Sequence, residues 1–143
     1  MTPTLWGRIQ SRVIIGLIIG GTWTIVVTPI IKPFSAPFSS AYFLTFFALL
    51  IVTFVGVVWE LVYHGLQQLR WEKDWPTLFG LLAGVPEFFT TLFWLLILTG
   101  DRSVPALTYC LHFGSTWIVI WLFTNGPVKI LFPRWRFNGG KFI

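Results

Sequence analysis

Long uncharged runs of apolar residues, separated by short clusters of charge, dominate the pattern along this 143-residue chain. A transmembrane helix rises about 1.5 Å per residue and needs roughly 20 apolar residues to cross the hydrocarbon of a bilayer. Four runs are long enough to cross once: residues 13–31, 33–59 and 103–128 contain no charge, and residues 75–100 contain one, Glu87. The pattern therefore predicts four transmembrane helices, over residues of about 12–31, 41–66, 76–99 and 104–128.

The composition explains why these helices belong in lipid. Hydrophobic residues make up 55% of the chain and charged residues only 10%, with a mean hydropathy of +0.77. A soluble domain carries about 25% charged residues, so this chain lacks the charge needed to cover a water-facing surface. The predicted fold class is all-α, a polytopic membrane protein whose four transmembrane helices form an antiparallel bundle. Residues 1–131 would form the transmembrane domain and residues 132–143 a basic, aromatic cytoplasmic tail.

Lysine and arginine set the predicted orientation, because cytoplasmic loops of membrane proteins are enriched in these two residues. With four crossings, the amino end, the loop near residue 70 and the carboxyl tail share one side. That side holds eight basic residues and the other holds two, so both termini are expected in the cytoplasm. The eight are Arg8, Arg12, Arg70, Lys73, Lys129, Arg134, Arg136 and Lys141, and the two are Lys32 and Arg102. Small size and short loops favour a bacterial or organellar inner membrane.

Each predicted helix carries one face of small and polar residues. In lipid, helices associate through close approach at small residues and through polar groups that bond across the interface. Two of the faces contain glycines four residues apart, in the sequences GLIIG and GLLAG. We expect these glycines to pack the first and third helices closely, within the subunit or across an oligomer interface. The predicted packing glycines are Gly16, Gly20, Gly80 and Gly84.

Glu87 is the most informative residue of the sequence, because it lies near the middle of the third predicted helix. At about 1.5 Å per residue, His112 on the fourth helix falls within about 5 Å of the same depth. An ionised carboxylate at the bilayer centre costs on the order of 2.5 kcal/mol or more, so both side chains are expected to face inward as a pair. The pair would be either neutral and hydrogen-bonded or a tight ion pair. Pro86 removes a backbone donor, which predicts a kink one turn around the glutamate.

A second acid, Glu60, lies four residues before His64 on one face of the second helix. This spacing favours an intrahelical contact near the headgroups. Neither acid–histidine pair supplies the three or more ligands that a metal site needs, so no metal is expected. A bis-histidine haem is disfavoured, because His64 and His112 are separated by about 20 Å along the membrane normal. No cofactor is predicted, and the sequence leaves open a tetrapyrrole with a single axial ligand or a bound lipid.

The tail LFPRWRFNGGKFI alternates basic and aromatic residues beyond the fourth helix. Anionic headgroups attract such residues at about 1 kcal/mol per base near the membrane surface. The residues predicted to contact lipid or to dock on a protein partner are Arg134, Trp135, Arg136 and Lys141. No nucleic-acid partner is expected.

The functional prediction follows from how little chemistry the sequence contains. It has one cysteine, Cys110, and no phosphate loop, paired zinc cysteines or nucleophile motif, so no enzymatic activity is expected. A bundle with almost no extramembrane domain suits a non-catalytic integral membrane subunit or scaffold of a larger assembly, with the bilayer and other subunits or copies of itself as partners. The alternative is a small proton-coupled transporter or channel with Glu87 as the ion-binding carboxylate. The candidate ion- or proton-binding residues are Glu87, His112, Glu60 and His64.

Overall fold

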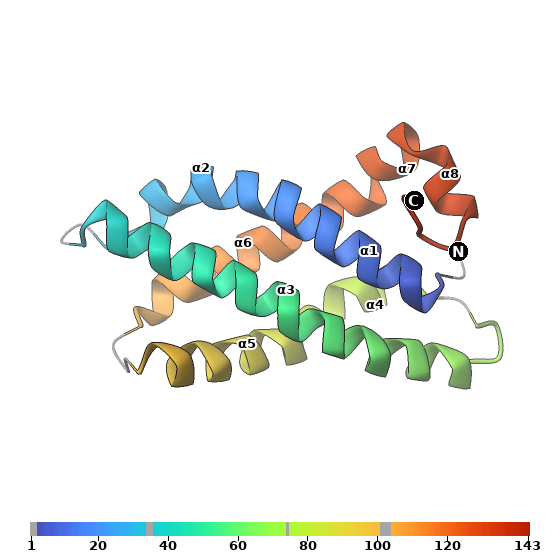
Figure 1. The fold of residues 1–143 in the computed structure, drawn as a ribbon, viewed down its shortest axis with the longest axis horizontal. Coiled ribbons are helices and arrows are strands. Elements are labelled where there is room, and N and C mark those ends of the chain that lie inside the picture. Colours follow the sequence, from blue (N-terminus) through green and yellow to red (C-terminus); the bar gives the residue numbers. More distant parts are fainter. Residues whose placement is uncertain (1–2, 34–35, 74, 101–103) are drawn as a thin grey trace.

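The computed structural model describes residues 3–33, 36–73, 75–100 and 104–143, and every regular element in these ranges is a helix (Figure 1). Four helical stretches are long and apolar enough to span a membrane, as the sequence predicts. They are Leu5–Ile31, Phe38–Leu69, Thr77–Thr99 and Ala106–Leu131, called here the first to fourth crossings. The elements in chain order are α1 (Leu5–Ile15), the π-helix η1 (Gly16–Gly20), α2 (Gly21–Ile31), α3 (Phe38–Leu69), α4 (Thr77–Leu82), α5 (Gly84–Thr99), α6 (Ala106–Asn125), α7 (Pro127–Leu131) and α8 (Pro133–Phe137).

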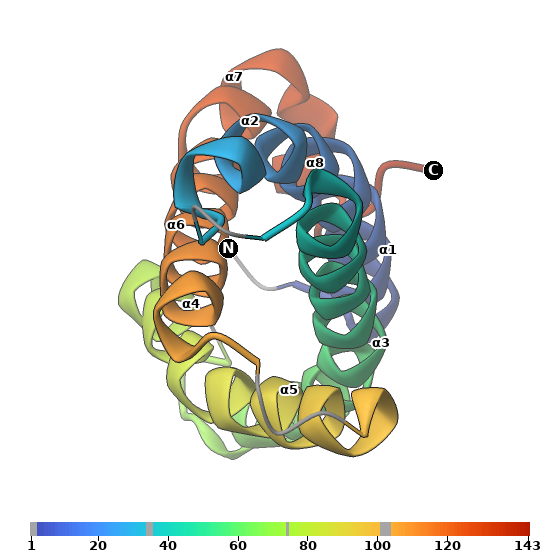
Figure 2. The ribbon, with the colours of Figure 1, turned by 90° about the vertical axis from the view of Figure 1, so that its left-hand side faces the viewer.

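The four crossings surround a common interior when the molecule is viewed along its length (Figure 2). α3 packs against α1 and α2 and also against α5, while α6 packs against α2 and α4. The first and third crossings therefore lie diagonally across the bundle. Close packing between these two crossings within the chain, one of the two arrangements expected from their glycines, is not what the structure shows.

Side chains of other helices, and not the backbone of a neighbouring helix, pack against the paired glycines. A methyl group on Gly20 would lie 3.0 Å from Cδ1 of Leu49 in the second crossing. A methyl group on Gly84 would lie 2.6 Å from Nε1 of Trp117 in the fourth crossing. These glycines are packing positions, but they accommodate side chains of the second and fourth crossings. A methyl group on Gly16 would lie 3.6 Å from Oγ1 of Thr53, and one on Gly80 would lie 3.6 Å from Cδ1 of Trp121.

The first crossing begins at Leu5 rather than near residue 12 as predicted. Thr4 caps the helix, because its hydroxyl accepts a hydrogen bond from the N–H of Gly7 at 3.1 Å. The prediction started the helix late because it assigned Arg8 and Arg12 to the membrane surface. In the structure both arginine side chains point into the bundle and are largely buried.

Pro86 interrupts the third crossing, as the sequence predicts. It has no N–H to donate to the carbonyl of Leu82, and α4 ends at Leu82 before α5 begins. α4 packs on α6 whereas α5 packs on α3, so the crossing changes neighbours at this break (Figure 1). Donors from other crossings satisfy nearby carbonyls: the Tyr63 hydroxyl donates to Ala83 at 3.1 Å, Trp117 Nε1 to Leu81 at 3.1 Å and Trp121 Nε1 to Thr77 at 3.0 Å.

Polar and apolar residues are distributed as expected for a protein dissolved in lipid. Large apolar side chains are exposed on all four crossings, Phe54 for example at 77%. Polar side chains gather inside, which confirms that the small and polar faces turn inward. The buried polar residues are Arg8, Thr24, Thr28, Thr45, Glu60, Gln67, Glu87, Thr91, Thr108, His112 and Thr116.

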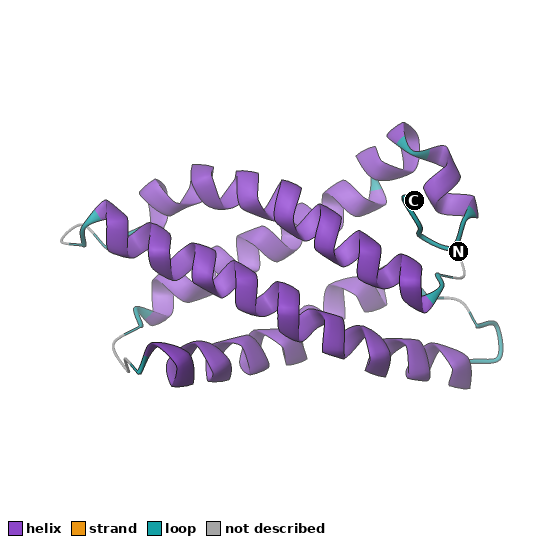
Figure 3. Ribbon diagram, in the orientation of Figure 1, coloured by secondary structure: helices purple, strands orange, loops and turns teal. Residues whose placement is uncertain are grey.

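The carboxyl-terminal tail folds back onto the start of α1 (Figure 3). Trp135 is only 5% exposed, packs with Ile15 and Val128, and donates from Nε1 to the Ser11 hydroxyl at 2.8 Å. The prediction that Trp135 contacts lipid or a partner is therefore wrong, because its ring fills the space between α1 and α7.

The remaining tail residues have different environments. Arg134 is exposed and Lys141 is half-buried, while the side chain of Arg136 lies outside the described part of the chain. The backbone N–H of Thr4 donates to the carbonyl of Gly139 at 2.9 Å. The two termini thus lie together at one end of the bundle, which we call the terminal end (Figure 1).

Candidate functional site

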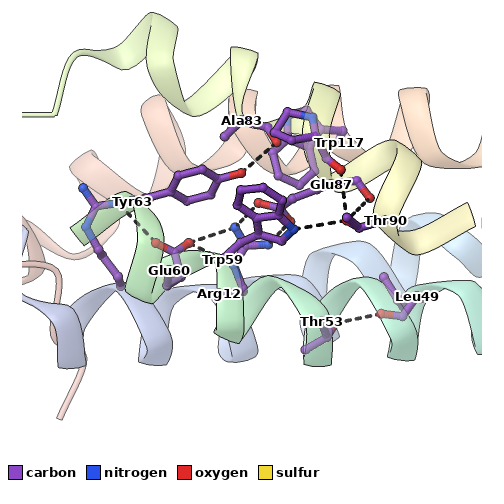
Figure 4. Close-up of polar contacts among 12 residues, drawn as sticks. Arg12, Leu49, Thr53, Trp59, Glu60, Tyr63, Ala83, Glu87, Thr90 and Trp117 are labelled. Atoms are coloured by element: carbon purple, nitrogen blue, oxygen red, sulfur yellow. Dashed lines mark hydrogen bonds and ion pairs between the residues drawn. The ribbon is translucent and has the colours of Figure 1, made fainter. Parts of the chain in front are cut away.

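A network of charged side chains lies inside the bundle and joins the first three crossings (Figure 4). Arg12, on α1, donates from Nη1 to Oε2 of Glu87 on α5 at 2.7 Å and from Nη2 to Oε1 at 2.8 Å. Two parallel N–H to oxygen bonds are the strongest geometry available to an arginine and a carboxylate. The Glu87 residue is 0% exposed. The acid in the third crossing is therefore a completely buried carboxylate with both oxygens paired.

Glu60, on α3, is the second acid of the network. Its Oε1 accepts from Nε of Arg12 at 2.9 Å, and its Oε2 accepts from Nη1 of Arg8 at 3.1 Å. Arg8 also donates from Nη2 to the side-chain oxygen of Gln67 at 2.8 Å, and its guanidinium lies 4.5 Å above the ring of Trp75. Each acid and each base thus has an ionic partner on another crossing.

The two arginines and two glutamates make the network neutral as a whole. An unpaired charge in the interior of a membrane is costly, so each group needs the opposite charges of the others to offset the free-energy cost of its burial. A buried ion pair adds little stability over well-packed apolar side chains, but removing one partner costs about 3–5 kcal/mol. All four groups meet only when α1, α3 and α5 have matching depths and rotations, as they have in this structure.

Gly56 and Trp117 shape the space around Arg12. A Cβ on Gly56 would lie 2.7 Å from Cζ of Arg12, so only glycine lets α3 pass beside the guanidinium. On another side, the ring of Trp117 lies 5.6 Å from the same carbon atom. The indole N–H of Trp117 is held by the carbonyl of Leu81 at the break in the third crossing. The break and the charged network are therefore parts of one packed region.

Glu87 and His112 both face the interior, as predicted, but they do not pair with each other. His112 Nε2 lies 3.0 Å from the hydroxyl of Thr24 on α2. That hydroxyl gives its own hydrogen to the carbonyl of Gly20 at 2.8 Å, so the histidine donates and the threonine accepts. The predicted contact is wrong because Arg12 extends deep enough along the interior to occupy both oxygens of Glu87.

The predicted contact between Glu60 and His64 is also wrong. Both oxygens of Glu60 instead accept charge-assisted hydrogen bonds from arginines of the first crossing. His64 instead lies with Nε2 3.5 Å from Nε2 of Gln68, and its Nδ1 has no hydrogen-bond partner. Of the four candidate ion-binding residues, the structure brings Glu60 and Glu87 together around Arg12 and leaves the two histidines outside the network.

Arg8 and Arg12 are the site residues that the sequence prediction missed. Their spacing contains a signal that could have found them. At four-residue intervals, Arg8 and Arg12 extend the inward face formed by Gly16, Gly20 and Thr24. Basic residues just before an apolar run also match the usual surface anchors of a membrane helix, so the sequence alone does not separate an interior base from a surface anchor.

The site has no evident place for a metal ion. No group of three or more histidine, cysteine, aspartate or glutamate side chains comes together among the described residues. The carboxylates that could act as ligands are already bound by arginine.

Comparison with known proteins gives no match to this chain among protein-family models, curated proteins or solved structures. The fold and the charged network together define a class, a small helical protein with four candidate membrane crossings and a neutral ionic interior.

Proposed function

We propose that this protein is a non-catalytic integral membrane subunit whose ionic network fixes the packing of its helices, so that its outer faces can meet other subunits or copies of itself. The observation that carries the proposal is the full occupation of Glu87 by Arg12, which also binds Glu60. Carboxylates that bind arginines of another crossing link the helices to one another. Neither carboxylate is free to take up and release an ion.

The outer surface supports a role within an assembly. Little of the described chain lies outside the four crossings, and the tail that does is packed on α1. The large exposed side chains of the crossings are apolar and suit acyl chains or partner helices. The described residues outside the crossings form only short connections and the packed tail, and we infer that the apolar outer faces work with other membrane proteins.

We further propose an antiparallel bundle with both termini in the cytoplasm of a bacterial or organellar inner membrane. Arg8 and Arg12 are buried and no longer count as surface anchors. Without them, the side of the termini still has six basic residues and the opposite side two. Because this imbalance persists, the orientation rule gives the same result.

The alternative of a proton-coupled transporter requires Glu87 to exchange Arg12 for an ion during each cycle. Arg12 would then need another partner, and Glu60 is the acid within reach. Such an exchange would break two hydrogen bonds to a fully buried carboxylate. The geometry therefore favours the structural role, and the two functions differ in what Glu87→Gln should do.

Cross-linking in intact membranes, followed by size analysis in a mild detergent, tests the subunit proposal. The wild-type chain is expected in species well above its monomer mass of 16.4 kDa. Arg12→Gln should lose these species, because the crossings lose their register, whereas Glu72→Gln, at an acid whose side chain is 72% exposed, should keep them. A wild-type chain that stays monomeric in intact membranes would contradict the proposal.

Proton flux into vesicles containing the purified protein tests the alternative. The subunit proposal predicts the same flux for wild type and Glu87→Gln as for empty vesicles. A flux that requires wild-type protein and disappears in Glu87→Gln, with the size distribution unchanged, would establish transport instead.

A further inference from the structure

A cavity of about 680 Å³ lies inside the bundle beside the charged network. Its walls come from α1, α3, α4 and α6, and its rim comes from α7, α8 and the tail. Cavities that bind small molecules span about 300–1,000 Å³, so this one has the volume of a ligand site. Along α6 it is lined from His112 to Asn125, a length of about 20 Å.

The lining of the cavity carries apolar side chains toward its inner end and a lysine at its rim. At the level of His112, Leu49, Val52 and Phe113 contribute apolar side chains beside the polar His112, Thr53 and Thr116. Its rim at the terminal end carries Lys129. A molecule that matched this lining would have an apolar chain directed inward and a polar group at the rim.

The basic groups of the lining favour a negative charge at the rim. Among the described residues, Lys129 Nζ donates to the side-chain oxygen of Asn125 at 2.9 Å, and an ammonium group has two further N–H donors. Arg8 and Arg12 also line the cavity, against one acid in the lining, Glu60. The arginines are neutralised by the network, so Lys129 is the charge that remains uncompensated.

The walls are held in place by bonds that do not need a ligand. Trp117 and Trp121 on α6 each donate an indole N–H to a carbonyl of α4. Trp135 at the rim donates to Ser11 on α1. A site with walls fixed in advance loses little conformational freedom when it is filled.

We propose that this cavity binds an amphiphile with an anionic head group, with its apolar chain between α1 and α6 and its carboxylate or phosphate at Lys129. The inference goes beyond the proposed subunit function and does not rest on it. The proposed ligand has an alkyl chain and an acidic head group, which a membrane phospholipid or a free alkyl acid could supply.

Photo-crosslinking tests where the chain lies. Purified full-length protein in a non-ionic detergent is incubated with a fatty acid that carries a diazirine near the end of its chain, and labelled peptides are identified by mass spectrometry. Label is expected on Leu49, Val52 or Phe113. Label confined to outward residues such as Phe54 would overturn the proposal. The same chain esterified in phosphatidylglycerol should label the inner residues if membrane lipid is the source, and the free acid alone should do so otherwise.

Native mass spectrometry with three probes tests the chemistry of the head. Dodecyl phosphate should bind, whereas inorganic phosphate and dodecyltrimethylammonium should not bind at the same concentration. Lys129→Gln should bind dodecyl phosphate about tenfold or more weakly, the loss expected for a hydrogen bond to a charged group. Lys32→Gln, at the other end of the bundle, is the matched control and should bind normally. Equal binding of the cationic probe, or equal binding by Lys129→Gln, would overturn the proposal.

Filling the cavity gives an independent test. Thr124 lines the cavity and donates from Oγ1 to the carbonyl of Ile120 at 2.7 Å. Thr22 makes the same bond to Ile18 at 2.7 Å but is exposed on the outside of α2. Thr124→Trp should abolish labelling of the inner residues, and Thr22→Trp should leave it unchanged, with both variants eluting as wild type in size exclusion. Labelling that survives in Thr124→Trp would overturn the proposal.

Discussion

Replacing Arg12 by glutamine should be the most damaging single change in this protein. The variant leaves Glu87, which is 0% exposed, without either of its two donors, while Glu60 keeps its bond to Arg8. Loss of one partner from a buried ion pair costs about 3–5 kcal/mol. Glu87→Gln should cost less, about 1–3 kcal/mol, because the amide oxygen still accepts from Arg12, which keeps its bond to Glu60.

The double variant Arg12→Gln/Glu87→Gln provides the sharper test. It removes one positive and one negative charge, so Arg8 and Glu60 remain as a neutral pair at 3.1 Å. We expect the double variant to be less destabilised than the sum of the single variants, by at least about 1 kcal/mol, since residues in one ionic network are coupled. Its stability should approach or exceed that of Arg12→Gln alone.

Reversible unfolding in mixed micelles, followed by tryptophan fluorescence, measures these free energies. The chain contains nine tryptophans, several of them in the packed interior, so the signal reports the bundle. Arg134→Gln is the control and should stay within about 0.5 kcal/mol of wild type, as exposed substitutions do. Additive effects of Arg12→Gln and Glu87→Gln would refute the argument that the two side chains act as a pair.

Three further predictions concern packing. Gly84→Ala should destabilise the protein by about 1–3 kcal/mol, because the new methyl group would lie 2.6 Å from Trp117 Nε1. Gly21→Ala is the control: a methyl group there would have no atom within 4 Å, so the variant should be neutral or slightly stabilising in the same unfolding assay. Trp117→Phe should lose about 1 kcal/mol with its hydrogen bond to α4 and should speed amide hydrogen exchange in α4; unchanged exchange would show that the bond does not hold this helix. Gly139→Ala should loosen the tail, because Gly139 has φ +62° and a methyl group there would lie 2.8 Å from Cγ2 of Thr4; tryptic cleavage of the tail at the wild-type rate would contradict this.

Much of the fold could be predicted because hydrocarbon imposes a simple rule along the chain. A run of about 20 apolar residues has few alternatives to a helix in lipid, so four crossings follow from the charge-free stretches. The same rule places Glu87 inside, since a carboxylate that faced acyl chains would be costly. The break before Pro86 also follows locally, from the missing N–H of proline.

The partner of Glu87 could not be predicted, because it depends on relations between helices. His112 has the right depth, but it lies on a helix whose rotation directs its ring to Thr24. Arg12 precedes the first apolar run, where a surface anchor and an interior base look the same in sequence. The order of crossings around the bundle decides between them, and no local pattern in the chain contains that order.

The burial of two arginines in the first crossing has a consequence for biosynthesis. Arg12 is translated 48 residues before Glu60 and 75 residues before Glu87, the acids that neutralise it. Each uncompensated arginine resists transfer into hydrocarbon by about 2.5–3.5 kcal/mol. We therefore expect the first helix to stay shallow in the bilayer until Glu60 and Glu87 have followed it into the membrane. A nascent chain that stops before these acids is expected to leave its amino-terminal turns at the membrane surface.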